Sequence, residues 1–333
     1  MKRATLQVLL AILFLMVSAG VGFSKGEIQT VSLMSAPFGT GSYVLGAALE
    51  DISKKSHPWL RISHSESPGL VFNIKKLDKE PGLKKETIVA STIGVNWLAE
   101  KGMQPFDKSY KGVKLLANYN LITVWLASLQ SDLNKPADFV GKKIALGRAT
   151  QISWAIQPEM IIRYGWHMAD KVKIQYVGTD PSISALLDGL ADAIVIGGYL
   201  NPKTFEFSLS PQTTELLSSG KRINHISWGA EAIKKTRETG MPITQLTIPA
   251  KAIAGLTEPI DSFTDSVAWC VAQEFPEELA YEITKLIIQK CADFAGYHNL
   301  GKLMSAEALP FGWEANQIHP GALRAYKESG ILK

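Results

Sequence analysis

Cysteine is scarce in this chain of 333 residues, which has only Cys270 and Cys291 and therefore no Cys-x-x-Cys motif. Its six histidines form neither an H-x-x-x-H nor an H-E-x-x-H pattern, so the common metal motifs are missing. The one G-x-S-x-G pattern, GFSKG at residues 22–26, follows the N-terminal apolar run and has no expected strand before it, so it does not predict a nucleophile elbow. We therefore predict that the protein is not an enzyme and uses no metal or cofactor.

The two cysteines lie in apolar patterns, one in an expected strand and one in an expected helix. We expect buried free thiols, and a disulfide between them is the alternative in an oxidising compartment. Hydrophobic residues make up 46% of the chain, which is typical of a folded globular protein. The length is sufficient for two lobes of ordinary domain size.

Charge of one sign is not in large excess, because the formal net charge is +4. Two of these charges, Lys2 and Arg3, begin a segment that has the order of a secretion signal, with an apolar run at 8–17 and small residues at 18–24. We expect residues 1–25 to be a cleaved signal peptide, with an uncleaved anchor as the alternative, and the mature protein to be periplasmic. The remaining charge is too weak to predict a nucleic-acid or membrane-surface partner.

Beyond the signal, β-rich runs alternate with helical apolar patterns. The first unit contains expected strands at residues 30–35, 59–63 and 87–91, with helices between them. This βαβαβ order predicts a parallel sheet with helices on its faces. A second unit of the same order begins near residue 121, with expected strands at 142–146, 172–177 and 192–196.

A strand expected at residues 262–271 returns the chain to the first unit. The chain thus crosses between the units twice, near residues 120 and 262. Two crossings predict an α/β protein of two lobes with a hinge and a ligand cleft between them. The expected bounds are residues 26–120 and 263–333 for lobe I and residues 121–262 for lobe II.

Three segments of lobe I follow the carboxyl ends of expected strands, where open α/β sheets bind ligands. The first reads GTGSY at residues 39–43, and its glycines let backbone N–H groups approach an anion at a helix N-terminus. The second reads SESPG at residues 65–69 and is either a ligand loop or a capped turn with a structural Asn behind it. The third follows the strand at 87–91. The predicted ligand contacts in lobe I are Gly41, Ser42, Tyr43, Ser67, Gly69, Asn73 and Thr92.

Two segments of lobe II face the same cleft. After the strand at 142–146, Arg148 offers a guanidinium fork that can pair with a carboxylate, and a solvated or salt-bridged surface arginine is the alternative. Asp188 and Asp192 are interpreted as structural, at a helix end and a strand start. The two glycines that follow are expected to end that strand on the cleft side. The predicted ligand contacts in lobe II are Arg148, Gln151, Ser153, Gly197 and Gly198.

The C-terminal residues 318–333 read IHPGALRAYKESGILK, in which Pro320 suits the first turn of a helix and Gly330 its end. The pattern H-P-G-A, then R-x-Y-K-E, then Gly, resembles the C-terminal signature of TAXI-type solute receptors of TRAP transporters. The segments DFVGKKIALG at 138–147 and LDGLADA at 187–193 also resemble this family. The loop RATQISW at 148–154 departs from it, because the family usually has a small Gly-Ser-Gly type loop there.

The resemblance covers about residues 28–330 and implies a type II-like periplasmic-binding-protein fold. It further implies a receptor that closes on a small carboxylate-bearing solute, such as an organic acid or an acidic amino acid. The receptor would deliver this solute to the integral membrane subunits of a TRAP permease. An ABC-type receptor and a ligand sensor for a signalling partner are the alternatives, and an exported enzyme ranks last.

Overall fold

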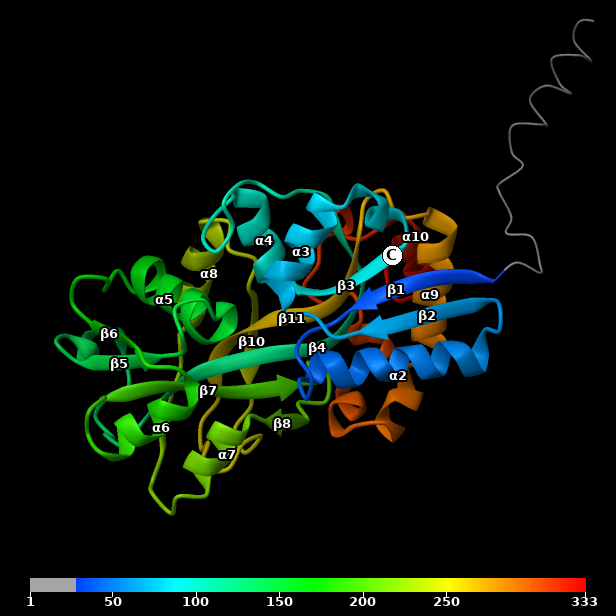
Figure 1. Ribbon diagram of the computed structural model, residues 1–333. Coiled ribbons are helices and arrows are strands. Elements are labelled where there is room, and N and C mark those ends of the chain that lie inside the picture. The colour runs from blue at the N-terminus through cyan, green and yellow to red at the C-terminus, as the bar shows by residue number, and fades with distance from the viewer. Residues whose placement is uncertain (1–27) are drawn as a thin grey trace, which may run out of the picture.

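An eleven-stranded mixed sheet organises residues 28–333, the part of the chain that the computed structural model describes (Figure 1). Neighbouring strands along its main path follow the order β2-β1-β3-β11-β4-β7-β5-β6. The predicted signal peptide at residues 1–25 lies outside the described residues. The strands are β1 (Gln29–Met34), β2 (Leu60–Ser65), β3 (Thr87–Thr92), β4 (Val113–Ser128), β5 (Lys143–Leu146), β6 (Lys173–Tyr176), β7 (Ala193–Leu200), β8 (Phe207–Leu209), β9 (Asn224–Ile226), β10 (Thr244–Ile248) and β11 (Ile260–Ala272).

Helices and short helical turns connect most of these strands. The α-helices are α2 (Gly41–Ser56), α3 (Leu70–Lys79), α4 (Ile93–Lys101), α5 (Gln157–Met160), α6 (Thr179–Leu187), α7 (Pro211–Leu217), α8 (Ala230–Glu238), α9 (Glu277–Gln289) and α10 (Pro320–Glu328). The π-helical turns are η3 (Ile152–Ile156) and η4 (Ile161–Gly165). The 3₁₀ turns are η1 (Pro81–Lys85), η2 (Pro136–Phe139), η5 (Cys291–Gly296), η6 (Asn299–Leu303), η7 (Ala306–Ala308) and η8 (Ala315–Gln317).

The first half of the sheet consists of β2, β1 and β3, which are parallel. Helix α2 connects β1 to β2, and it begins where the Thr40 hydroxyl accepts a hydrogen bond from the Tyr43 backbone N–H at 3.3 Å. Its apolar face buries Leu45, Leu49 and Ile52, in the helical spacing that predicted this helix. The βαβαβ order expected for the first unit is therefore confirmed.

The second half consists of β7, β5 and β6, and β5 pairs in parallel with both neighbours. The connection from β5 to β6 is one helical stretch in which α5 lies between the π-turns η3 and η4. This stretch buries Ile161 and Ile162 in the core of the second half. The helix that the sequence predicted after residue 151 is thus present, with wider turns than an ordinary α-helix has.

The long strands β4 and β11 are antiparallel neighbours that connect the two halves (Figure 1). Strand β4 pairs with β11 over residues 113–124 and with β7 over residues 121–127, so it passes from the first half into the second. Strand β11 pairs in addition with β3 over Val267–Val271. The crossings that were predicted near residues 120 and 262 fall within these two strands.

The C-terminal helix α10 packs on α9 and on β4. Pro320 occupies its first position, and His319 caps it by accepting a hydrogen bond from the Gly321 N–H at Nδ1, at 3.3 Å. The Tyr326 hydroxyl is fully buried and donates to the Leu116 carbonyl at 2.6 Å. Gly330 follows the helix with a positive φ of 69°, as the sequence predicted for the helix end.

Both cysteines are free and buried, which confirms the predicted thiols. Burial raises the pKa of Cys270 to about 12 and that of Cys291 to about 12, so neither thiol is a reactive nucleophile. Across residues 28–333 the structure has no helix with the length and apolar character needed to cross a bilayer.

Candidate functional site

The two halves of the sheet meet where α4, which follows β3, lies against η3, which follows β5. Trp97 and Ile156 pack against apolar clusters on both sides of this junction, and Ile152 packs against the cluster around α3 and α4. Both elements begin at the carboxyl ends of parallel strands, which is the ligand-binding edge of open α/β sheets. The junction is therefore the part of the structure that corresponds to the predicted cleft.

A buried carboxylate lies at the centre of this junction. Asp265 on β11 is 0% exposed; its Oδ1 accepts from the Gly94 N–H at 3.1 Å, and its Oδ2 accepts from the Ser153 hydroxyl at 2.8 Å. Burial raises the pKa of Asp265 to about 6, and the hydrogen bonds from Ser153 and Gly94 oppose that rise. One side chain thus connects the first turn of α4 with η3.

The space around this carboxylate is tightly filled. A Cβ added to Gly94 would lie 2.7 Å from Ile152 Cγ1, 2.9 Å from Gln157 Nε2 and 3.3 Å from Asp265 Oδ1. Gln157 is 0% exposed, and its side chain lies beside the Asp265 carboxylate, where it favours the ionised form and so opposes the rise in pKa.

The predicted contacts at the start of α2 pack within the first half. A Cβ at Gly41 would lie 2.6 Å from Leu300 Cδ1, the end of a flexible side chain that would have to shift. The Ser42 and Tyr119 hydroxyl oxygens are 2.5 Å apart and buried. Tyr43 is half-buried and packs edge-on against two neighbouring aromatic rings.

The predicted contacts at the end of β2 form a turn that is held by its own side chains. The Ser67 hydroxyl donates to the Ser35 carbonyl at 2.9 Å and accepts from the Gly69 N–H at 3.2 Å. The Asn73 amide is fully buried and donates to the Ser35 carbonyl at 2.7 Å and to the Ala90 carbonyl at 3.0 Å. These bonds fix the ends of β1 and β3 relative to each other, which is the structural role that the sequence left open for Asn73.

Arg148 is exposed at the edge of the junction. Its backbone N–H donates to Gln151 Oε1 at 2.7 Å, which closes the turn before η3. Within residues 28–333 its guanidinium has no hydrogen-bond or ion-pair partner, and its stem passes 3.5 Å from the position of a Cβ on Gly178. The guanidinium fork is therefore free to receive an anion from solvent.

Gly197 and Gly198 differ from the prediction that they end a strand on the cleft side. They lie inside β7, which continues to Leu200. A Cβ on Gly197 would lie 2.2 Å from the Thr123 carbonyl oxygen, and one on Gly198 would lie 2.6 Å from the Ser208 carbonyl oxygen. The expectation of a strand end was wrong because these glycines allow β4 and β8 to approach β7 closely.

The structure brings two of the predicted contacts together, one from each half of the sheet. The Thr92 hydroxyl accepts from the Val95 N–H at 3.0 Å as the N-cap of α4, and it also lies beside the Asp265 carboxylate. Ser153 reaches the same carboxylate from η3. Sequence reasoning missed Asp265 and Gln157. Asp265 is one of two acidic residues of β11, and its position between Phe263 and Val267 in the alternating pattern of a strand was the signal that could have identified it.

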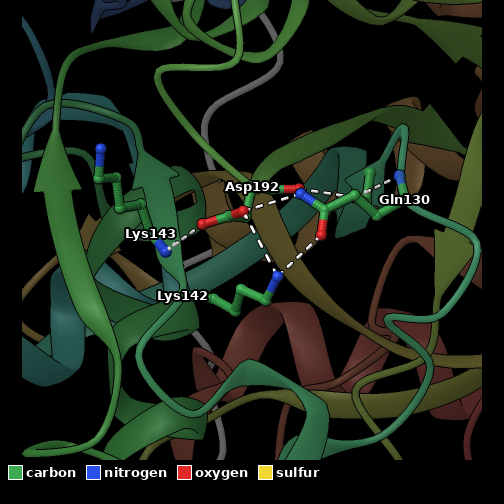
Figure 2. Close-up of polar contacts among 5 residues, drawn as sticks. Gln130, Lys142, Lys143 and Asp192 are labelled. Atoms are coloured by element: carbon green, nitrogen blue, oxygen red, sulfur yellow. Dashed lines mark hydrogen bonds and ion pairs between the residues drawn. The ribbon is translucent and has the colours of Figure 1, made fainter.

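The acidic residue Asp192, predicted to be structural, has that role. Figure 2 shows its carboxylate between the Lys143 backbone N–H, which donates at 2.8 Å, and the Gln130 amide, which also donates at 2.8 Å. The Lys142 ammonium lies 3.8 Å away. This network fixes the starts of β5 and β7, away from the junction of the two halves.

Two surface hollows lie apart from the predicted contacts. One of about 610 Å³ is lined by residues that follow β4, by residues in and before β9, and by the segment before β11, including Arg222 and His225. Another of about 590 Å³ lies between β8 and η6. None of the predicted contacts lines either hollow. Among residues 28–333 there is also no cluster of three or more His, Cys, Asp or Glu side chains that could hold a metal ion.

The fold is that of the periplasmic-binding-protein type. A structure titled as a TctC solute binding protein from Polaromonas has a TM-score of 0.52 and 16% identity, covering 91% of this chain and 97% of that chain. MatC from Rhodopseudomonas palustris, solved with bound malate, has a TM-score of 0.46 and 14% identity, covering 91% of this chain and 96% of that chain.

The chain belongs to the NMT1-like family, whose sequence model matches residues 33–330. This match extends from the end of β1 to the second residue after α10, so it includes both halves of the sheet and both connecting strands.

Proposed function

We propose that this protein is a periplasmic solute receptor that captures a small molecule between its two lobes and delivers it to a membrane permease. The observation that carries the proposal is the arrangement of the sheet, in which the neighbouring strands β4 and β11 connect two α/β halves. The edges of these halves that could bind a ligand meet at the junction of α4 and η3. A molecule that contacts both halves favours the closed arrangement, and so it shifts a hinge equilibrium.

The lobes we propose are residues 26–120 with 263–333, and residues 121–262. Their boundaries lie in β4 and β11, and separate apolar clusters support the division. The cluster of the first lobe includes Leu33, whereas the clusters of the second include Ile144 and Ile194. Arg148, at the edge of the second lobe, is the residue we propose to receive an acidic group of the solute, since its guanidinium is exposed and free.

The solute class and the permease follow from the sequence resemblance. The C-terminal motif of residues 318–333 supports a TAXI-type receptor, and with it a small organic acid or acidic amino acid as solute and a TRAP permease as partner. The fold gives the motif a structural basis, because His319, Pro320 and Gly321 form the start of α10. At the junction the Ser153 hydroxyl donates a hydrogen bond to the Asp265 carboxylate, which we interpret as a contact between the two lobes.

The proposal is tested by a thermal-shift screen of the mature protein, first unfolded and refolded to remove carried-over ligand. The compounds are small carboxylates, amino acids and neutral controls. A ligand that binds only the folded state raises the melting temperature by mass action, by roughly 2–4 °C for each tenfold increase above the dissociation constant. A rise with one acid that is recovered chemically unchanged is the expected result. No rise with any compound, or turnover of the compound, would contradict the proposal.

A further inference from the structure

The N-terminus of α4 has the properties of an anion-binding position. Its first backbone N–H groups have no partner within the helix, and the helix dipole favours negative charge there. Thr92 satisfies one of these groups by accepting from Val95. The N–H of Gly94 is satisfied by Oδ1 of Asp265, so the negative group at this helix end comes from the chain itself.

The pairing of the strands assigns this contact to the first lobe. Val267 on β11 is the partner of Thr92 on β3, and Asp265 lies two residues before it, next to the start of α4. The carboxylate and α4 are therefore held together by the sheet, whether the lobes are open or closed. Ser153 on η3 belongs to the other lobe, so its bond to Oδ2 is the one that opening would break.

We propose that Asp265 is a specificity-determining residue that fills the anion position at the N-terminus of α4, so that an acidic group of the solute is received elsewhere in the cleft. This inference rests on the proposed function of the cleft. Two features support it beyond the helix end itself. The carboxylate is completely buried, and the buried Gln157 side chain lies beside both this carboxylate and the same N-terminal turn.

The proposal also defines the chemistry of the solute at this position. When Ser153 withdraws, Oδ2 of Asp265 is left as an acceptor that faces the other lobe. A second carboxylate would be repelled there, whereas an ammonium, amide or hydroxyl group could donate to it. The acidic group of a solute would then lie toward Arg148, and its donor group toward Asp265.

Chemical rescue tests the assignment without knowledge of the solute. In the full mature chain, Asp265→Ala removes the carboxylate and leaves the Gly94 N–H and the Ser153 hydroxyl without their acceptor. Sodium acetate and sodium formate are titrated against this variant at constant ionic strength. Sodium chloride controls for the general effect of salt, and acetamide controls for a molecule of the same shape as acetate without its charge. Ser266→Ala is the matched variant, because Ser266 is a buried neighbour on β11 that carries no charge.

The expected result is a rise in the melting temperature of Asp265→Ala of roughly 2–4 °C for each tenfold increase in acetate above its dissociation constant. The wild type, Ser266→Ala and the acetamide titration should show no such rise. The proposal would be overturned if the Asp265→Ala variant had the same melting temperature in acetate and in chloride. It would also be overturned if acetate raised the melting temperature of the wild type by the same amount.

A variant that does not fold still decides the question. If Asp265→Ala is recovered only by refolding in acetate or formate, the anion position is supported, and equal loss in acetate and chloride counts against it. The readout is the stability of the protein alone. A failed rescue therefore rejects the role of Asp265, whereas an empty solute screen with the wild type rejects the proposed function.

Discussion

Ionisation of Asp265 is costly in the folded protein, and this makes stability depend on pH. Its folded pKa is about 6, against an ordinary value of 3.8, so its carboxyl group favours folding most below pH 4, and this contribution is lost as pH rises through 6. The difference corresponds to about 3 kcal/mol. We expect the free energy of unfolding of the wild type, relative to Asp265→Asn, to fall by this order between pH 4 and 7. Urea unfolding at four pH values measures it, and a constant difference would contradict the assigned burial.

Asn73 is expected to stabilise the fold rather than to bind a ligand. Asn73→Ala leaves the buried carbonyls of Ser35 and Ala90 without their donor, and we expect a loss of about 2–4 kcal/mol in the free energy of unfolding. The exposed Asn316→Ala is the control and should change stability by less than about 0.5 kcal/mol. If Asn73→Ala unfolds like the wild type but loses solute affinity, the ligand role is the correct one.

Arg148 is expected to bind a ligand rather than to stabilise the fold, the opposite of Asn73. Its guanidinium is exposed and free, so Arg148→Ala is expected to leave the melting temperature unchanged and to weaken a carboxylate solute by about 1.5–3 kcal/mol. Calorimetric titration with the acid identified in the screen measures the effect. Arg61→Ala, at an exposed position of β2, is the matched control. Equal affinity of the Arg148 and Arg61 variants would remove Arg148 from the site.

At the scale of elements, the contact between α9 and α10 depends on the absence of a side chain. A Cβ on Gly321 would lie 2.0 Å from the Glu277 carbonyl oxygen, which is backbone and cannot move aside cheaply. Alanine is favoured over glycine in a helix by about 1 kcal/mol, yet overpacking costs typically 1–3 kcal/mol or more. We therefore expect Gly321→Ala to be destabilising overall in thermal unfolding. Gly296→Ala, where a Cβ would meet nothing within 4 Å, should be close to neutral.

Periodicity predicted most elements because it reports local burial. The strands of both βαβαβ units and the two crossings followed from alternating runs, and α10 followed from Pro320 and Gly330. The end of β7 was wrong, since Gly197 and Gly198 are used for close packing against strands that are distant in sequence. A glycine pair alone cannot distinguish a turn from a crowded strand.

The site was less predictable than the elements. Ser153 and Thr92 were identified because they follow strand ends, which is a local signal. Their common partner Asp265 lies far along the chain, 112 residues after Ser153. That pairing depends on how β11 inserts into the sheet, and a single sequence does not contain this information.

At the scale of the whole molecule, Gly94 lies where the two lobes that we propose come into contact. A side chain there would meet Ile152 and Gln157 of the other lobe, so Gly94→Val is expected to hold the lobes apart. Small-angle scattering should then give a larger radius of gyration than that of the wild type, which is roughly 19 Å for a compact chain of this length. Gly82→Val, at a position with open space around it, should leave the radius unchanged. An unchanged radius in Gly94→Val would mean that the junction does not move as a hinge.

The place of β11 in the sheet also bears on how the chain is made. This strand lies between β3 and β4, although it is synthesised long after both of them. Until residues 260–272 have left the ribosome, β3 and β4 each have an open edge, and the first lobe also lacks α9 and α10. A nascent chain therefore cannot complete either its sheet or its core until these late residues have been made. A prematurely terminated chain would expose the same edges to chaperones, proteases and aggregation.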